Sequence, residues 1–195
     1  MAAAFTMFLV IVVVIGMMTP PRNSDNVRTD RLGPMSGESA GEYAARAAAA
    51  LDQAGALDHW GLVTFDPPAS PAVVISAVGD VRISRVVVDG SSGARAEDEA
   101  YRTLPDMPID LPAPVEGRNT PGDALETAVA AALSRIRTFR GAFDDGVTPD
   151  CACIVGVVVR GDGDTLRAAA RQDAVATVEP LAGDAVWGHF AVRAR

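Results

Sequence analysis

The cysteines Cys151 and Cys153 are the most chemically distinctive pair in this sequence. One alanine separates them, and residues i and i+2 of a strand share a face, so both thiols should point the same way. Three interpretations remain open: two small buried residues of a core strand, a disulfide, or a redox-active pair. The first is favoured, because the neighbouring Asp150 opposes formation of the thiolate that redox or metal chemistry requires.

Other residues that bind metals or act as bases are sparse. His59 and His189 would complete a Cys2His2 set, but the spacing matches no zinc finger or zinc ribbon. The acidic residues at 144–145 and at 162–164 lack the spacing of a calcium loop and are better explained as turns and helix caps. The chain carries no Walker A, G-x-G-x-x-G, H-E-x-x-H or G-x-S-x-G motif. We therefore expect no cofactor, no bound metal and no enzymatic activity.

The composition excludes one large class of partner. The chain has 195 residues, of which 49% are hydrophobic, and its formal net charge is −8. Phosphate contacts require clustered basic side chains, so a domain this acidic is a poor ligand for nucleic acid. We expect no nucleic-acid partner.

The stretch from Ala2 to Met18 is apolar and contains no charged side chain. About 17 helical residues cover ~26 Å, just enough to cross a thin hydrocarbon core. A cleaved secretory signal and a buried soluble helix are the alternatives. No basic side chain precedes the run, and Pro20 and Pro21 follow it where a small-residue cleavage site would lie, which counts against a signal. The sequence predicts a single membrane-spanning helix, with the lipid bilayer as one partner.

Two indicators of membrane orientation disagree. Arg22, Arg28 and Arg31 follow the span, and the positive-inside rule would place them in the cytoplasm. An N-terminal span more commonly exports the chain that follows it. We expect a single-pass protein of the cell membrane whose soluble domain is extracytoplasmic.

Residues 19–36 predict a flexible tether, because they are rich in Pro, Asn, Asp, Arg and Gly and lack apolar periodicity. Residues 37–195 are enough for one domain with its own core. Periodicity and capping residues predict helices at 38–54, 71–78, 120–140 and 164–171. The third helix should cover the sheet with an apolar stripe made of Leu125, Val129, Leu133, Ile136 and Phe139 or Arg140.

The same patterns predict strands at 60–65, 81–88, 151–160 and 174–181, with one more edge strand near Trp187, His189, Phe190 and Val192. Arg85 breaks the alternation of the second strand, which fits a bulge or an edge position. The near-continuous apolar run of the third predicts a central strand buried on both faces.

The two halves of this domain share one order: long helix, strand, short helix, strand. The similarity lies in the order of the elements and not in the residues, and internal duplication is a hypothesis. The order predicts an α/β fold, with α+β as the alternative, in which helices pack on a four- or five-stranded sheet as a two-layer sandwich. The short strand–helix–strand units fit either parallel crossovers or a ferredoxin-like arrangement.

Residues 89–119 predict a long irregular loop. Four prolines prevent a helix and favour extended backbone, namely Pro105, Pro108, Pro112 and Pro114. An acidic cluster precedes them, made of Glu97, Asp98 and Glu99. Loops of this length in compact domains are commonly functional, so we expect this one to contact a membrane or envelope protein.

These features together predict a membrane-anchored, non-enzymatic interaction or sensor domain of the cell envelope. The alternative is a thiol-dependent redox protein that uses Cys151 and Cys153. The sequence identifies neither the partner nor the oligomeric state.

Overall fold

The computed structural model describes residues 30–92, 104–112, 120–140 and 147–195 of the chain. Within these ranges, four helices pack on a five-stranded antiparallel sheet, and a small parallel pair of strands lies beside it. The predicted mixed α/β class is confirmed. In chain order the elements are β1 (Asp30–Leu32), α2 (Ala40–Gln53), β2 (His59–Ala69), α3 (Pro71–Val78), β3 (Arg82–Val88), β4 (Met107–Asp110), α5 (Pro121–Arg140), β5 (Ile154–Gly161), α6 (Gly163–Ala170), β6 (Val175–Pro180) and β7 (Phe190–Val192).

The main sheet has the strand order β4-β3-β5-β2-β6, and every neighbouring pair is antiparallel. The unit β2-α3-β3 leaves a gap that β5 fills, and the unit β5-α6-β6 leaves a gap that β2 fills. Two split strand–helix–strand units therefore interleave, which is the ferredoxin-like arrangement. The order of elements shared by the two halves corresponds to α2-β2-α3-β3 and α5-β5-α6-β6.

Each described helix begins at a residue whose side chain accepts a backbone N–H of the first turn. Ser39 and Glu42 form a capping box on α2, and Thr120 and Asp123 exchange the same two bonds on α5. The other caps are Ser70 for α3 and Asp162 for α6. These bonds satisfy donors that a helix leaves unpaired, so short polar signals fix where the helices start.

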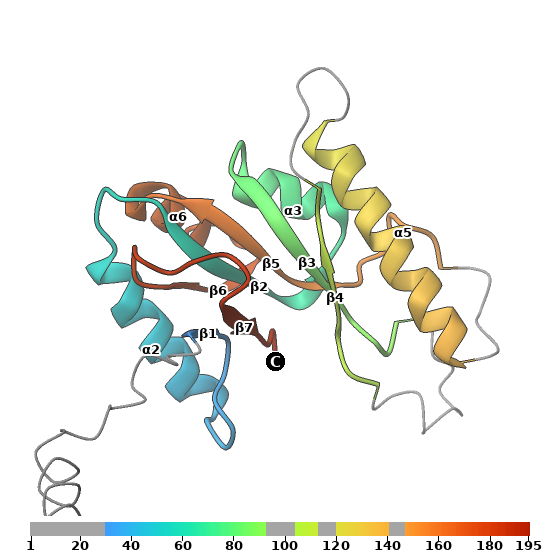
Figure 1. Ribbon diagram of the computed structural model, residues 1–195, viewed down its shortest axis with the longest axis horizontal. Helices are drawn as coiled ribbons and strands as arrows, with labels where there is room; N and C mark the ends of the chain where they lie inside the picture. Colours follow the sequence, from blue (N-terminus) through green and yellow to red (C-terminus); the bar gives the residue numbers. More distant parts are fainter. Residues whose placement is uncertain (1–29, 93–103, 113–119, 141–146) are drawn as a thin grey trace, which may run out of the picture.

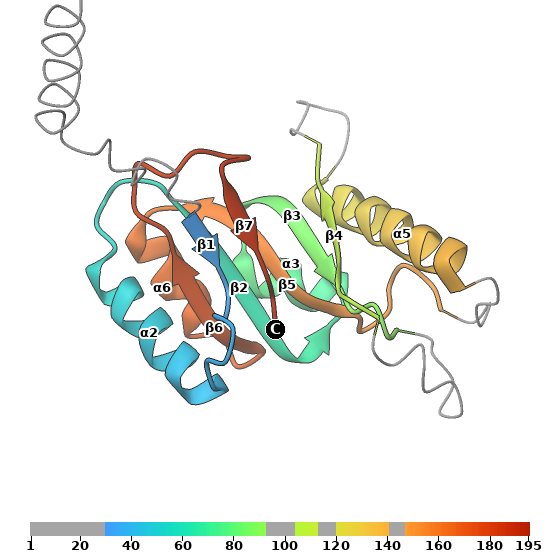
Figure 2. The ribbon, with the colours of Figure 1, turned by 60° about the horizontal axis from the view of Figure 1, so that its bottom comes forward.

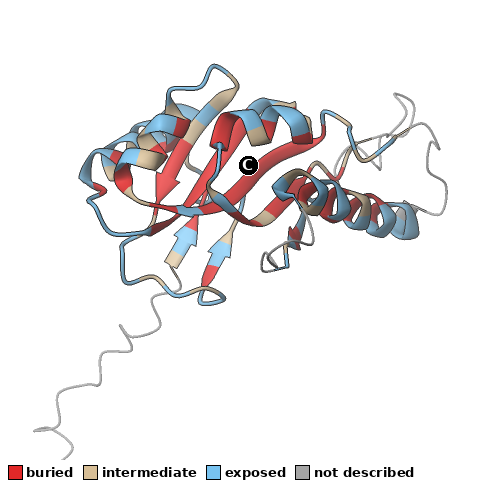
Figure 3. Ribbon diagram, turned by 90° about the horizontal axis from the view of Figure 1, so that it is seen from above, coloured by how far each residue is buried: buried red, intermediate tan, exposed pale blue. Residues whose placement is uncertain are grey.

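Helices α3, α5 and α6 cover one face of the sheet, and α2 packs on the edge strand β6 and on α6 (Figure 1). The stripe predicted for α5 is buried at Leu125, Val129, Leu133 and Ile136. Phe139 is 75% exposed, so the stripe ends one turn earlier than predicted. Figure 3 shows the buried residues running along the strands and the inner side of the helices. This face holds the larger hydrophobic core.

The opposite face of the sheet is partly covered by β1 and β7, which pair in parallel (Figure 2). Beneath them Trp60 and Trp187 lie 4.7 Å apart, measured between ring centroids. The guanidinium of Arg160 lies 5.3 Å from the Trp60 ring, and that of Arg85 lies 5.2 Å from the Trp187 ring. The sandwich therefore gains a third layer here, which the two-layer prediction lacked.

The structure corrects one predicted strand boundary and supports one predicted irregularity. The strand predicted to stop at Asp66 runs on as β2 to Ala69, and its pairing with β5 skips from Thr64 to Ala69. Pro67 and Pro68 lie in this irregular stretch, where no residue of β2 pairs with β5 and no backbone N–H is needed for that pairing. The interruption predicted at Arg85 is confirmed as a register shift between Ile83 and Arg85.

Two segments predicted to be irregular contain strands. β1 lies inside the predicted tether, and β4 lies inside the predicted loop 89–119. The predicted edge strand of the tail is β7, but it pairs with β1 instead of the main sheet. Each of these strands has only three or four residues, so local periodicity gives little signal for it.

No helix among the described residues is long and apolar enough to cross a bilayer. The predicted span Ala2–Met18 and residues 19–29 lie outside the described ranges.

Candidate functional site

The two cysteines form a disulfide, with their Cα atoms 5.3 Å apart. They lie just before β5, in a turn, and not inside the strand as predicted. Cys153 is 1% exposed and belongs to the main core, whereas Cys151 is half-buried. The sulfur of Cys151 is therefore the one that an external thiol reaches more easily. The favoured interpretation, two free core residues, is replaced by the second one.

We predict that reducing this disulfide changes stability only modestly. A bond that closes a three-residue loop removes little chain entropy from the unfolded state, about 1.5 kcal/mol against about 3 for a 15-residue loop. The full-length protein in detergent should lose about that much unfolding free energy in a urea titration with reductant. A Cys151→Ser/Cys153→Ala variant should match the reduced protein. A loss above about 3 kcal/mol would show instead that the disulfide contributes strongly to the stability of the fold.

The predicted partner-contact residues are only partly within the described ranges. Pro105, Pro108 and Pro112 are exposed, and Pro108 lies within β4. Glu97, Asp98, Glu99 and Pro114 lie outside the described ranges. Pro108 lies in the edge strand of the sheet, which pairs with β3, and Pro105 and Pro112 flank that strand.

A hollow of about 480 Å³ adjoins Pro105 and Pro108 on the face of the sheet that β1 and β7 partly cover, and we call it the proline hollow. The guanidinium of Arg195 closes one side of it by bonding Asp106 at 2.7 Å and Asp89 at 2.5 Å. Gly90 packs so tightly against the Pro105 carbonyl that a Cβ there would lie 2.1 Å from the oxygen. Two ion pairs and this contact therefore hold the Pro105 end of the segment. The hollow is lined by Val87, Ser91, Leu104, Pro105, Asp106, Pro108 and residues 192–195.

A second hollow of about 390 Å³ lies on the other side of residues 194–195, and we call it the hydroxyl hollow. Three hydroxyls from different elements line it, beside the charged residues Glu38, Asp66 and Arg195. Thr64 and Thr177 pair across β2 and β6 with 2.6 Å between their Oγ1 atoms, and Thr177 donates to the Tyr43 hydroxyl at 3.4 Å. The hollow is lined by Pro34, Glu38, Ala40, Tyr43, Thr64, Phe65, Asp66, Pro68, Val155, Ala176, Thr177, Ala194 and Arg195.

A partly buried ion cluster supports this hollow. The Arg46 guanidinium bonds the carboxylates of Glu179 and Glu38, and the Glu179 side chain is 4% exposed. Glu179 also accepts the Gly33 N–H at 2.6 Å, and Arg46 donates to the Gly33 carbonyl at 3.0 Å. The cluster joins α2, β6 and the end of β1. These contacts raise the pKa of Arg46, with the hydrogen bond to Glu38 as the largest contribution.

This cluster predicts a specific loss of stability in acid. The hydrogen bond from Arg46, then that from the Met35 N–H, lowers the pKa of Glu38 from 4.5 to about 2. Because the folded pKa lies below the unfolded one, the stabilisation is present above about pH 4.5 and disappears as pH falls towards 2. Urea midpoints measured between pH 5 and pH 2 should therefore fall less in Glu38→Gln than in the parent. Glu126→Gln, at an exposed position on α5, is the control and should follow the parent.

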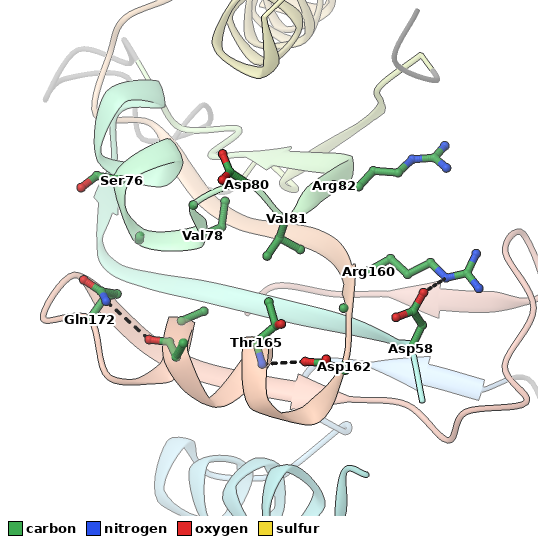
Figure 4. A pocket seen from close by; sticks show the side chains of 15 residues that line it. Asp58, Ser76, Val78, Asp80, Val81, Arg82, Arg160, Asp162, Thr165 and Gln172 are labelled. Carbon is green, nitrogen blue, oxygen red and sulfur yellow. Dashed lines mark hydrogen bonds and ion pairs between the residues drawn. The ribbon is translucent and has the colours of Figure 1, made fainter. Parts of the chain in front are cut away.

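A third hollow, of about 490 Å³, is a groove between α3 and α6 (Figure 4). Its floor is made of small apolar residues such as Ala77 and Ala169. Several polar side chains at its rim are engaged locally: Asp162 accepts the Thr165 N–H at 2.8 Å, and Asp58 lies 3.6 Å from Arg160. Figure 4 shows Arg82 and Arg160 extending away from the groove. The groove thus has space but few free groups that converge on a ligand.

The remaining candidates from the sequence are separated from one another. His59 is buried, and its Nδ1 lies 2.8 Å from the Leu181 carbonyl, whereas His189 is exposed. Asp164 pairs with Arg167 at 2.8 Å. Among the described residues no group of three or more His, Cys, Asp or Glu side chains is placed to hold a metal ion. The acidic residues at 144–145 lie outside the described ranges.

The hydroxyl hollow is the site that sequence reasoning missed. Tyr43 and Thr177 are 134 positions apart, and Thr64 and Thr177 are 113 apart. Thr and Tyr residues carry no motif at such separations, so the sequence offers no signal for their meeting.

Comparisons of the chain with protein family models, curated proteins and solved structures find no match. The site is therefore interpreted from its geometry alone.

Proposed function

We propose that this protein is a single-pass, membrane-anchored, non-enzymatic interaction or sensor domain of the cell envelope. The observation that carries the proposal is the uncharged run Ala2–Met18, which is long enough for one span. Eleven residues separate its end from β1, and 11 extended residues reach at most about 40 Å. The domain would therefore work close to the bilayer.

The extracytoplasmic orientation is supported by the disulfide between Cys151 and Cys153. Disulfides persist in oxidising compartments and are uncommon in the cytosol. This argument is independent of the arginines that follow the span, and it favours the opposite side from the one they indicate.

The proposed contact surface is the proline hollow with the exposed residues Pro105, Pro108 and Pro112. The Leu111 N–H donates to the Ser84 carbonyl, so by alternation the backbone groups of Pro108 and Asp110 point outwards from β4. Proline has no N–H to offer, which disfavours addition of another strand to this edge. A partner would instead contact proline side chains and the hollow beside them.

Membrane fractionation tests the anchor. The full-length protein should stay in the bilayer pellet after high-salt and carbonate washes, and detergent should release it. Recovery in the wash would contradict membrane anchoring.

A photo-crosslinking amino acid tests the contact surface. Placed at Pro108 in intact cells, it should capture a membrane or envelope protein that the same group at the exposed Gln172 does not capture. Capture at Gln172 alone would place the interface in the α3–α6 groove.

The disulfide also favours a second candidate, a thiol-dependent redox function. A substrate thiolate would attack the Cys151 sulfur, break the S–S bond and expel the Cys153 thiolate. The second thiolate of the substrate would then attack the substrate's own sulfur in the mixed disulfide and release the Cys151 thiolate. The substrate leaves as a disulfide, and two electrons and two protons reduce the pair to thiols.

Trapping separates the two candidates. A redox function predicts that Cys153→Ala accumulates a mixed disulfide through Cys151 in cells, whereas Cys151→Ala does not. If neither variant forms an adduct and both are sorted normally, the interaction role stands without redox chemistry.

A further inference from the structure

The hydroxyl hollow points to a ligand that the proposed function does not require. Its volume of about 390 Å³ lies within the range of small-molecule sites. Its walls come from Pro34 and Glu38 before α2, from α2 itself, from β2, β5 and β6, and from residues 194–195. Thr64 forms part of its floor and is only 6% exposed.

The direction of the hydroxyl protons decides which ligand atoms fit. A hydroxyl has one proton and two acceptor lone pairs. Thr177 donates its proton to Tyr43, so the proton in the Thr64–Thr177 pair must come from Thr64. Burial raises the pKa of Tyr43, and the hydrogen bond with the Glu179 carboxylate and its charge raise it further, which keeps the phenol protonated. Thr64, at the end of this chain, has no proton left and presents lone pairs only.

The charges around the hollow also favour a ligand that donates hydrogen bonds and carries a positive charge. Arg46 is shared by two carboxylates, Glu38 and Glu179, which leaves one net negative charge on one side. Arg195 also lines the hollow, and its positive charge is offset by Asp89 and Asp106, which lie outside the lining. Asp66 is exposed and adds another carboxylate at the rim. The carboxylates of the Arg46 cluster and of Asp66 would therefore attract a cation and repel an anion.

We propose that the hydroxyl hollow binds a small organic ammonium ion, with the ammonium on Thr64 and Asp66 and an apolar body against Val155 and Ala194. An ammonium carries three donors and no acceptor, which matches lone pairs and carboxylates. The site is independent of whether Ala2–Met18 spans a bilayer.

Three probes of nearly equal shape and different charge test the proposal: benzylamine, benzyl alcohol and benzoate. Each is titrated into the full-length protein in nanodiscs of zwitterionic lipid, and backbone amide shifts are followed by NMR. Benzylamine should shift the amides of Thr64 and Thr177 saturably, with a Kd at least about tenfold lower than that of benzyl alcohol. Benzoate should bind more weakly than either. Equal affinities, or tightest binding of benzoate, would overturn the proposal.

Two variants locate the ammonium. Thr64→Val keeps the shape and removes the acceptor, and it should weaken benzylamine about tenfold with little effect on benzyl alcohol. Thr165→Val makes the same change in the α3–α6 groove and should have no effect. If Thr64→Val does not fold, Asp66→Asn at the exposed rim decides, with an expected weakening of about threefold. Benzylamine binding that neither folded variant changes, or shifts confined to the α3–α6 groove, would overturn the assignment.

Discussion

Replacing Arg46 with Met should destabilise the domain by about 3 kcal/mol. The Glu179 carboxylate is 4% exposed, and without Arg46 it would be a buried charge with no cation beside it. Arg46 is itself 31% exposed, so the cost should fall at the lower end of the range for broken buried pairs. Urea unfolding of the full-length protein in detergent, followed by tryptophan fluorescence, measures the effect.

The matched control removes the orphaned charge as well. In the double variant Arg46→Met/Glu179→Gln, a neutral amide oxygen can still accept the Gly33 N–H, which Glu179 accepts at 2.6 Å. More than half of the lost stability should return, because most of the cost comes from the uncompensated charge. If the double variant is no more stable than Arg46→Met alone, the pair does not act through charge.

Replacing Gly33 with Ala should cost about 3–5 kcal/mol. Gly33 has φ +105°, and a Cβ there would lie 1.6 Å from the Arg193 carbonyl oxygen. Backbone strain and overpacking each contribute a few kcal/mol at such a position. The Leu32 carbonyl accepts the Arg193 N–H at 2.9 Å, so the expected consequence is separation of β1 from β7.

Gly37→Ala is the control for this substitution. Gly37 also has positive φ, +82°, but nothing lies within 4 Å of the added Cβ. Its cost should stay near the 1–2 kcal/mol of conformational strain alone. Hydrogen exchange at the Leu32 amide should rise strongly in Gly33→Ala and stay near the parent in Gly37→Ala. Equal effects would mean that the Arg193 contact is not limiting.

Gly33 would also matter for the proposed attachment to the membrane. β1 is the first described element after residues 1–29, and Gly33 connects it to the Arg46–Glu179 cluster. Separation of β1 would lengthen the proposed tether and open the wall of the hydroxyl hollow near Pro34. The same variant should therefore weaken benzylamine binding, whereas Gly37→Ala should not.

The sequence by itself determined the features that depend on neighbours within about four residues. Helix starts at Ser70, Thr120 and Asp162 follow from side chains that cap the next turn. The apolar spacing of α5 and the continuous apolar run of β5 predicted a covering helix and a central strand, and both are confirmed. The cysteine pair and the exposed prolines were visible as candidates because their residues lie close together in the chain.

Only the tertiary structure decided which distant residues meet. The pairing of β1 with β7, the Arg46–Glu179 pair and the chain of three hydroxyls all join residues more than 100 positions apart. Such contacts depend on how complete surfaces pack and on which buried polar groups find partners, and no local pattern encodes them. The domain class could therefore be predicted from short-range rules, whereas the ligand site could not.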